Sequence, residues 1–163
     1  MEKYQFEDDG IIPNSVYPLI IYKNAFQAGE AMADEMEERF ASNGWGNAWR
    51  NGVFPYHHYH SITHEVLGVY SGNAILHLGG DKGEKLEVKS GDVIVIPAGV
   101  GHKKISASAE FGVIGAYPGG MDYDLKTGKE GERPKADDNL ARVPFPETDP
   151  MFGTSGGIME YWK

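Results

Sequence analysis

The chain has 163 residues, of which 40% are hydrophobic, enough for one domain with a single core and unlike a disordered chain. It contains no cysteine, which excludes disulfide scaffolds, thiolate zinc sites, cysteine-held iron–sulfur clusters and cysteine nucleophiles. Its formal charge of −9 argues against binding to nucleic acid or to anionic membranes, because both require cationic patches.

The composition favours short strands joined by many turns. Glycine (22 residues) and proline (9 residues) exceed average usage, and aromatic residues make up 12% of the chain. The first ten residues lack the apolar segment of a secretory signal, and no uncharged apolar stretch approaches the roughly 20 residues of a membrane helix. We therefore expect a cytoplasmic protein with an all-β fold.

A leading strand and one helix are predicted before the main body of the fold. Residues 1–23 read as an extended segment ending in the apolar run Leu19–Tyr22. Asn24 is a plausible N-cap, so we predict an amphipathic helix from there to about Ala41. The apolar residues of this segment fall near helical spacing: Phe26, Met32, Ala33, Met36 and Phe40. The opposite face is mostly acidic, which indicates a solvated surface; a docking surface for a partner is the alternative.

The segment from Trp45 to Tyr117 has a different pattern of apolar and glycine residues. Short apolar runs such as NAILHLGG and DVIVIPAG alternate with glycine-rich turns. This pattern predicts a barrel or meander of short strands, with no helix between Gly44 and Gly120.

The last part of the chain, residues 118–163, is rich in proline and charge. We predict an extended tail that lies on the barrel, with a terminal strand near Gly157 to Trp162. Met159, Tyr161 and Trp162 are apolar or aromatic, which suggests that the tail is tied down. There is no internal repeat, so a second barrel is not expected.

Histidines concentrate in one short stretch: four of the six lie within residues 57–64. Because side chains alternate along a strand, His58 and His60 point to one side and His57 to the other. Two imidazoles on one strand face favour a metal site, and Glu65 can add an oxygen ligand. The negative charge of Glu65 would offset only part of the metal's 2+ charge. The pocket would remain net cationic, which favours an anionic or enolisable oxygen ligand.

A further ligand must come from elsewhere in the chain, where the remaining histidines are His77 and His102. His102 follows the apolar strand Val93–Ile96 and a Pro-Ala-Gly turn, which can direct the next side chain inward. His77 could line the pocket or the surface, because the strand register is not known. His64 reads as a surface loop residue, with contact to Glu65 or a substrate as the alternative.

Large aromatic residues flank the histidine segment: Trp45, Trp49, Tyr56 and Tyr70. Core packing is the expected role for most of them, with one or two walling a cavity.

Two stretches resemble the sequence motifs of the cupin family. Residues 52–72 contain a glycine, H-x-H, a glutamate and a glycine at the spacing of the first cupin motif. Residues 91–102 contain the glycine, proline, glycine and histidine of the second. Ser106 departs from the usual asparagine of that motif, at a position that is not a ligand. Further stretches, including IPAGVGHK and ARVPFPETDP, are similar to the small bacterial cupins of the YjlB type.

The resemblance implies a cupin-type β-barrel, also called a double-stranded β-helix or jelly roll, with one N-terminal amphipathic helix. A single domain would then span residues 1–163, with the barrel core at 45–117 between the leading segment 1–44 and the tail 118–163. Carried over residue by residue, the metal ligands are His58, His60, Glu65 and His102. They would hold one divalent ion, Fe, Mn, Ni or Zn.

By the same resemblance, the protein is expected to be a metal-dependent enzyme that acts on a small anionic or chelating molecule. It would be dioxygenase-like with Fe(II), or an isomerase or lyase with Mn, Ni or Zn. A small-ligand binding or sensor module without turnover is the alternative. Catalytic residues are not identified, since Glu65 is a ligand and His64 and Tyr70 are only candidates for a proton carrier. Exposed barrel edges suggest a homodimer.

Overall fold

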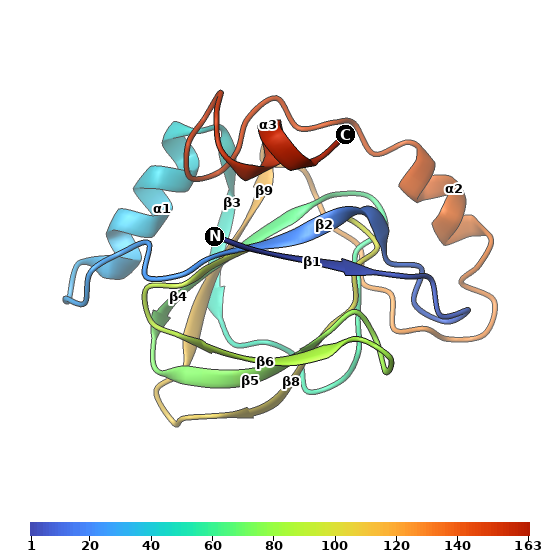
Figure 1. The fold of residues 1–163 in the computed structure, drawn as a ribbon, viewed down its shortest axis with the longest axis horizontal. Coiled ribbons are helices and arrows are strands. Elements are labelled where there is room, and N and C mark those ends of the chain that lie inside the picture. Colours follow the sequence, from blue (N-terminus) through green and yellow to red (C-terminus); the bar gives the residue numbers. More distant parts are fainter.

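The computed structural model describes residues 1–163 and consists mainly of two antiparallel sheets with three helices around them (Figure 1). The larger sheet has the order β1 (Glu2–Phe6), β2 (Ser15–Tyr22), β7 (Val93–Ile96), β4 (Glu65–Ser71), β9 (Gly112–Pro118) and β3 (Trp45–Asn51). The smaller sheet has the order β6 (Glu84–Lys89), β5 (Asn73–Leu78) and β8 (His102–Ala107). The helices are α1 (Met32–Ser42), α2 (Lys135–Ala141) and α3 (Gly157–Tyr161). The predicted all-β jelly roll is thereby confirmed.

The central strands of the larger sheet are buried on both faces. On β4 and β9, Leu67 and Val113 belong to the apolar cluster shared with the smaller sheet, whereas Val66 and Ile114 belong to a second cluster that includes α1 and the tail. In a strand that is buried on both faces, successive side chains can all be apolar. This explains the uninterrupted apolar run Val93–Ile96 of β7. Odd-numbered residues of β4 and β9 therefore face the barrel interior. The same alternation determines which side chains of these two strands can reach a site inside the barrel.

The predicted N-terminal helix exists, but it starts later than the sequence suggested. Helix α1 begins at Met32, and Asn24 is not its N-cap: Asn24 lies in a turn with a left-handed φ of +51°. The backbone N–H of Asn24 donates to the Asp92 carboxylate at 3.0 Å, and those of Ala25 and Phe26 donate to the Gly91 carbonyl. These hydrogen bonds and the left-handed backbone of Asn24 hold residues 24–26 in a turn against the segment before β7, outside a helix.

The apolar face of α1 packs on the larger sheet as the spacing predicted. Its buried residues are Met32, Ala33, Met36 and Phe40. Its acidic face is solvated, although Arg50 on β3 pairs with Asp34 at 2.8 Å and with Glu37 at 2.7 Å.

The C-terminal tail lies on the fold, but the predicted terminal strand is wrong: Gly157–Tyr161 is the short helix α3 (Figure 1). The buried Asp149 carboxylate accepts the N–H of Ile158 at 3.2 Å and the Tyr22 hydroxyl at 2.7 Å. Ile158 and Trp162 are spaced by one helical turn and are both buried. The tail is tied down because the Trp162 indole donates to the Pro18 carbonyl at 2.8 Å.

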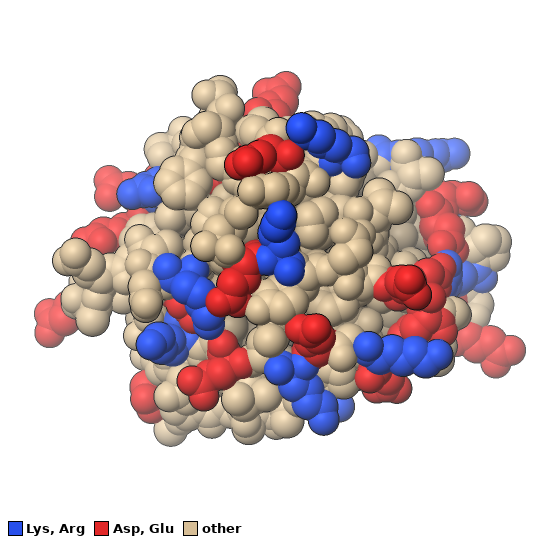
Figure 2. Space-filling model, in the orientation of Figure 1, with Lys and Arg blue, Asp and Glu red and all other residues tan.

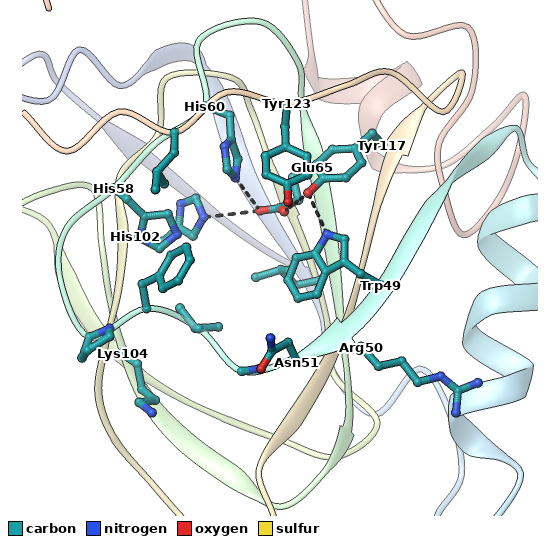
Figure 3. A pocket seen from close by; sticks show the side chains of 16 residues that line it. Trp49, Arg50, Asn51, His58, His60, Glu65, His102, Lys104, Tyr117 and Tyr123 are labelled. Carbon is teal, nitrogen blue, oxygen red and sulfur yellow. Dashed lines mark hydrogen bonds and ion pairs between the residues drawn. The ribbon is translucent and has the colours of Figure 1, made fainter.

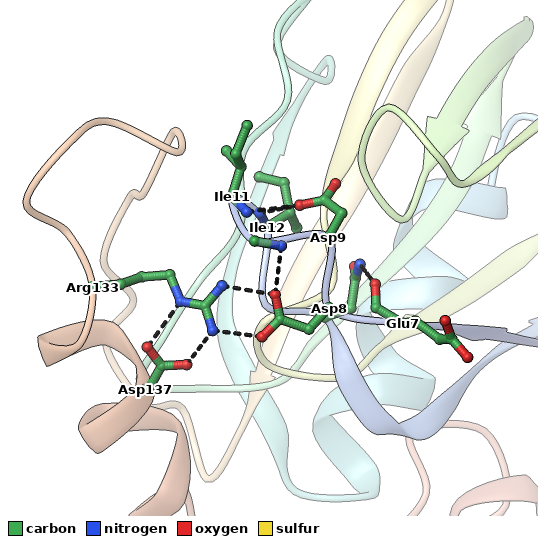
Figure 4. A network of polar contacts seen from close by, with 9 residues as sticks. Glu7, Asp8, Asp9, Ile11, Ile12, Arg133 and Asp137 are labelled. Atoms are coloured by element: carbon green, nitrogen blue, oxygen red, sulfur yellow. Dashed lines mark hydrogen bonds and ion pairs between the residues drawn. The ribbon is translucent and has the colours of Figure 1, made fainter.

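The preceding part of the tail is anchored to the N-terminal segment by one arginine (Figure 4). The Arg133 guanidinium makes a two-pronged contact with the Asp8 carboxylate, at 2.8 and 2.6 Å. It also bonds both carboxylate oxygens of Asp137 on α2, at 2.8 and 2.6 Å. The bidentate geometry on both sides fixes the direction in which the tail leaves the barrel.

The surface carries charges of both signs. Figure 2 shows lysine and arginine side chains interspersed with aspartate and glutamate over the face in view, rather than gathered by sign. None of the three helices combines the length and the apolar character that crossing a bilayer demands.

Candidate metal centre

Strand pairing brings the two histidine-bearing segments together. The N–H of His58 donates to the carbonyl oxygen of His102 at 3.2 Å, and the N–H of His102 donates to that of His58 at 2.9 Å. This isolated antiparallel bridge places both side chains at the same point of the barrel wall. His60 follows two residues later on the same face, as strand alternation predicted.

The three imidazoles converge and are buried. The nitrogen atoms that His58, His60 and His102 can offer all lie within 4.8 Å of one another. The Nδ1 atoms face the backbone carbonyl oxygens of Tyr56 (3.0 Å), Asp124 and Val100 (3.1 Å), respectively. A carbonyl oxygen can only accept, so each Nδ1 carries a proton, and in the neutral imidazole the lone pair is then on Nε2. These are the tautomers that a metal ion requires.

Glu65 joins the same cluster from the larger sheet. It is the first residue of β4 and has the same parity as Leu67, so its side chain enters the barrel interior. Its Oε1 lies 3.4 Å from Nε2 of His60 and 3.3 Å from Nε2 of His102. The structure therefore brings together all four side chains that the sequence singled out (Figure 3).

The ionisation states in this cluster favour the binding of a cation. Burial alone would raise the pKa of the Glu65 carboxyl, but His60 and His102 outweigh burial and hold it well below its ordinary range. Burial, aided by the nearby His102, lowers the pKa of His58 to about 3, so this imidazole is neutral. Burial opposes protonation of His60 as well, yet the Glu65 carboxylate raises its pKa. An ionised carboxylate among imidazole nitrogens around one point is a donor set that fits a divalent metal ion.

The four side chains lie at the inner end of a cavity of about 490 Å³. Apart from them, its wall is mainly aromatic and aliphatic, with Arg50, Asn51 and Lys104 as polar members. The aromatic members are Trp49, Phe54, Tyr117 and Tyr123. Arg50 points away from the cavity towards α1, as Figure 3 shows, whereas Lys104 lies on the cavity side of β8.

Two tyrosines of the wall were not singled out by sequence. Tyr117 has the same parity on β9 as Val113 and so faces inward, where its hydroxyl donates to Glu65 Oε2 at 3.0 Å. Burial, followed by the Glu65 charge, raises the pKa of the Tyr117 phenol far above its ordinary value, so it keeps its proton. Tyr123 stacks on Tyr117 with 5.0 Å between ring centroids. For Tyr117, the alternation of side chains along β9 could have indicated its inward position from the sequence. No sequence feature pointed to Tyr123.

Tyr123 belongs to a loop that is fastened to the histidine segment. Lys126 exchanges two backbone hydrogen bonds with Tyr59, at 2.9 and 3.0 Å. The Asp124 carboxylate accepts the N–H of Ser61 at 2.7 Å and also the Ser61 hydroxyl. Because the Asp124 carbonyl also bonds His60, the loop orients an imidazole and closes one side of the cavity.

The remaining histidines lie outside the cavity. His57 faces away from it, as predicted, and its Nε2 lies 2.8 Å from Asp81. His77 is buried beside His57, with 4.8 Å between the ring centroids. The prediction that His64 is a surface residue is wrong. It is 3% exposed, packs against Trp162, and its Nδ1 accepts the N–H of Ala98 at 2.8 Å. The apolar tail covers this loop, which local sequence does not reveal.

The two candidates for a proton carrier, His64 and Tyr70, do not line the cavity. Of the flanking aromatic residues, Trp45 is a core residue and Trp49 walls the cavity. Tyr56 is 41% exposed at the outside, stacked on Phe54 with 5.1 Å between centroids.

Comparison with known proteins gives a match to one protein family and a relative that is similar over almost the whole chain. The Cupin domain family matches residues 49–114. The "Uncharacterized protein YjlB" of Bacillus subtilis (strain 168) is 48% identical over 162 residues, which cover 99% of this chain and 96% of the relative.

Solved structures are more distant. Procruciferin, an 11S globulin from Brassica napus, is 22% identical with a TM-score of 0.40, over 49% of this chain and 21% of its own. The chain thus spans about a fifth of that globulin's length. A DUF861 family protein from Thermotoga maritima is 18% identical with a TM-score of 0.39, over 60% of this chain and 96% of its own.

Proposed function

Because the chain belongs to the cupin family, we propose that it holds one divalent metal ion through His58, His60, Glu65 and His102 and acts on a small anionic, chelating molecule. The observation that carries this proposal is the convergence of three imidazole nitrogens and one carboxylate oxygen at the inner end of a cavity. A bound Fe(II) would supply oxygen activation, and bound Mn, Ni or Zn would supply Lewis acidity.

The cavity wall supports an anionic ligand with an apolar body. Lys104 is the cation on the cavity side, and it takes part in none of the ion pairs of the fold. Arg50 is neutralised by Asp34 and Glu37 and contributes little charge to a ligand. Phe54 and Tyr123 pack edge-on against His58 and His60, with 5.2 and 5.3 Å between ring centroids, and add apolar surface to the cavity wall.

Among the enzymatic alternatives, oxygen chemistry is favoured over isomerisation. Beyond the proposed ligands, the cavity wall offers no imidazole or carboxylate that could carry a proton. Isomerases and lyases most often move a proton with a histidine or a carboxylate within reach of the substrate, whereas a dioxygenase-like reaction places less demand on such a group. The absence of a further imidazole or carboxylate also supports a sensor that binds its ligand without turnover, which is the second candidate function.

Oxygen uptake distinguishes these functions. The metal-free protein is loaded anaerobically with Fe(II) and then exposed to O₂ in the presence of small thiols, diols and diketones. The dioxygenase-like function predicts oxygen consumption that depends on both Fe(II) and one class of these compounds. Tight binding of a compound without oxygen consumption would favour the sensor, and neither binding nor consumption would contradict both.

A further inference from the structure

We propose that Tyr117 is a positioning residue that occupies one oxygen of Glu65, so that the carboxylate offers a single oxygen, Oε1, to a metal ion. The inference rests on the proposed metal site and concerns how one of its ligands is presented. It assigns a role to Tyr117 and, through it, to Trp49.

The hydrogen bonds around Tyr117 have a fixed direction (Figure 3). The Trp49 indole nitrogen can only donate, and it lies 2.7 Å from the Tyr117 hydroxyl oxygen. The Tyr117 oxygen therefore accepts from Trp49, which leaves its own proton for Glu65 Oε2 at 3.0 Å. An ionised carboxylate can only accept, so the chain runs from Trp49 through Tyr117 to Glu65.

The two oxygens of Glu65 are consequently in different environments. Oε2 is engaged by the Tyr117 hydroxyl, and Oε1 faces the Nε2 atoms of His60 and His102. A carboxylate that binds through one oxygen fills one coordination position, whereas one that binds through both fills two. By holding Oε2, Tyr117 preserves a position for a ligand that enters from the cavity.

The position of Trp49 is secured by a glycine. Trp49 on β3 pairs with Gly115 on β9, and a Cβ atom at Gly115 would overlap the indole ring. The indole thus packs directly on the backbone of β9, and from there its nitrogen reaches Tyr117, two residues further along the same strand face. The Tyr117 ring is fixed from the other side by stacking on Tyr123.

The test replaces Tyr117 by Phe, which removes the hydroxyl and keeps the ring. Tyr70→Phe is the matched control, because it removes a phenol hydroxyl from the strand of Glu65 but outside the cavity. Each protein is loaded with Co(II), whose visible absorption reports coordination number, and is then titrated with acetohydroxamate, a chelator that binds through two oxygens.

For Tyr117→Phe we expect an altered Co(II) spectrum and an affinity for acetohydroxamate that is weaker by about tenfold. Tyr70→Phe should match the wild type in both. Trp49→Phe should shift the spectrum in the same direction as Tyr117→Phe, because an unrestrained Tyr117 hydroxyl no longer aims at Oε2. If Tyr117→Phe binds Co(II) with the wild-type spectrum and chelator affinity, the role of Tyr117 is refuted while the metal site stands. If the wild type takes up no Co(II), the metal site and the inference both fail.

Discussion

The backbone N–H of Gly99 donates to the carbonyl oxygen of His60 at 2.8 Å. This bond fastens the turn before β8 to the segment that carries the first two histidines, three residues ahead of His102. The arrangement of the imidazoles is therefore held by main-chain hydrogen bonds, and a side chain can be removed without opening the bridge. Substitutions at the histidines should consequently test metal binding rather than folding.

Replacing His102 with Ala should lower the affinity for a divalent metal by at least about tenfold, because one of the three converging nitrogens is lost. Isothermal titration of the metal-free protein with Zn(II) measures this change. His57→Ala is the control, since His57 is the neighbour of the cluster that faces away from the cavity, and its affinity should remain near that of the wild type. A large loss in His57→Ala would contradict the assignment of strand faces.

Lys104→Met should weaken the binding of oxalate, a small chelating anion, to the metal-loaded protein. A single charge at a partly exposed site is worth about 1 kcal/mol, which corresponds to a loss of roughly fivefold. Lys103→Met removes the same charge from the opposite face of β8 and should have little effect. Equal losses in the two variants would indicate a general effect of net charge and would argue against an anion site beside Lys104.

Protonation of the buried His64 should make the stability of the protein fall in mild acid. Burial lowers the pKa of His64 in the folded protein to about 4, whereas an unfolded histidine titrates near 6.5. The contribution of this neutral imidazole is complete above about pH 6.5 and is lost as the pH falls towards 4. Between about pH 7.5 and about pH 5 the loss amounts to about 2 kcal/mol, or several degrees in Tm.

Thermal denaturation of His64→Asn across this range checks the expectation. The variant keeps a polar group that can accept the Ala98 N–H but does not titrate, so its Tm should depend less on pH than that of the wild type. His57→Asn serves as the control, because it removes an imidazole from the same segment that contacts neither Ala98 nor Trp162. An unchanged pH dependence in His64→Asn would show that another group is responsible.

The sequence predicted the histidine cluster better than its surroundings, for a physical reason. The alternation that joins His58 to His60 is local, and the strand–turn pattern before His102 is local as well. Trp49, by contrast, reaches Tyr117 only because β3 pairs with β9 in one particular register. Register and pairing partners arise from the whole sheet and are not encoded in a short segment.

The errors at the two ends of the chain have a similar origin. The start of α1 was misplaced because Asn24, whose φ is +51°, is held in a turn by Asp92, which is distant in sequence. The strand predicted near the C-terminus is a helix because Asp149 accepts the N–H of Ile158. In both cases a buried carboxylate supplied by another element outweighs the local preference of the segment.

Anomalous diffraction tests the central claim most directly. Crystals of the protein soaked in Zn(II) should give, in data collected at the zinc absorption edge, one strong peak per chain. We expect it at about 2.0–2.2 Å from Nε2 of the three clustered histidines and from Oε1 of Glu65. The absence of a peak among these four side chains, or a peak held only by groups elsewhere on the chain, would contradict the assignment.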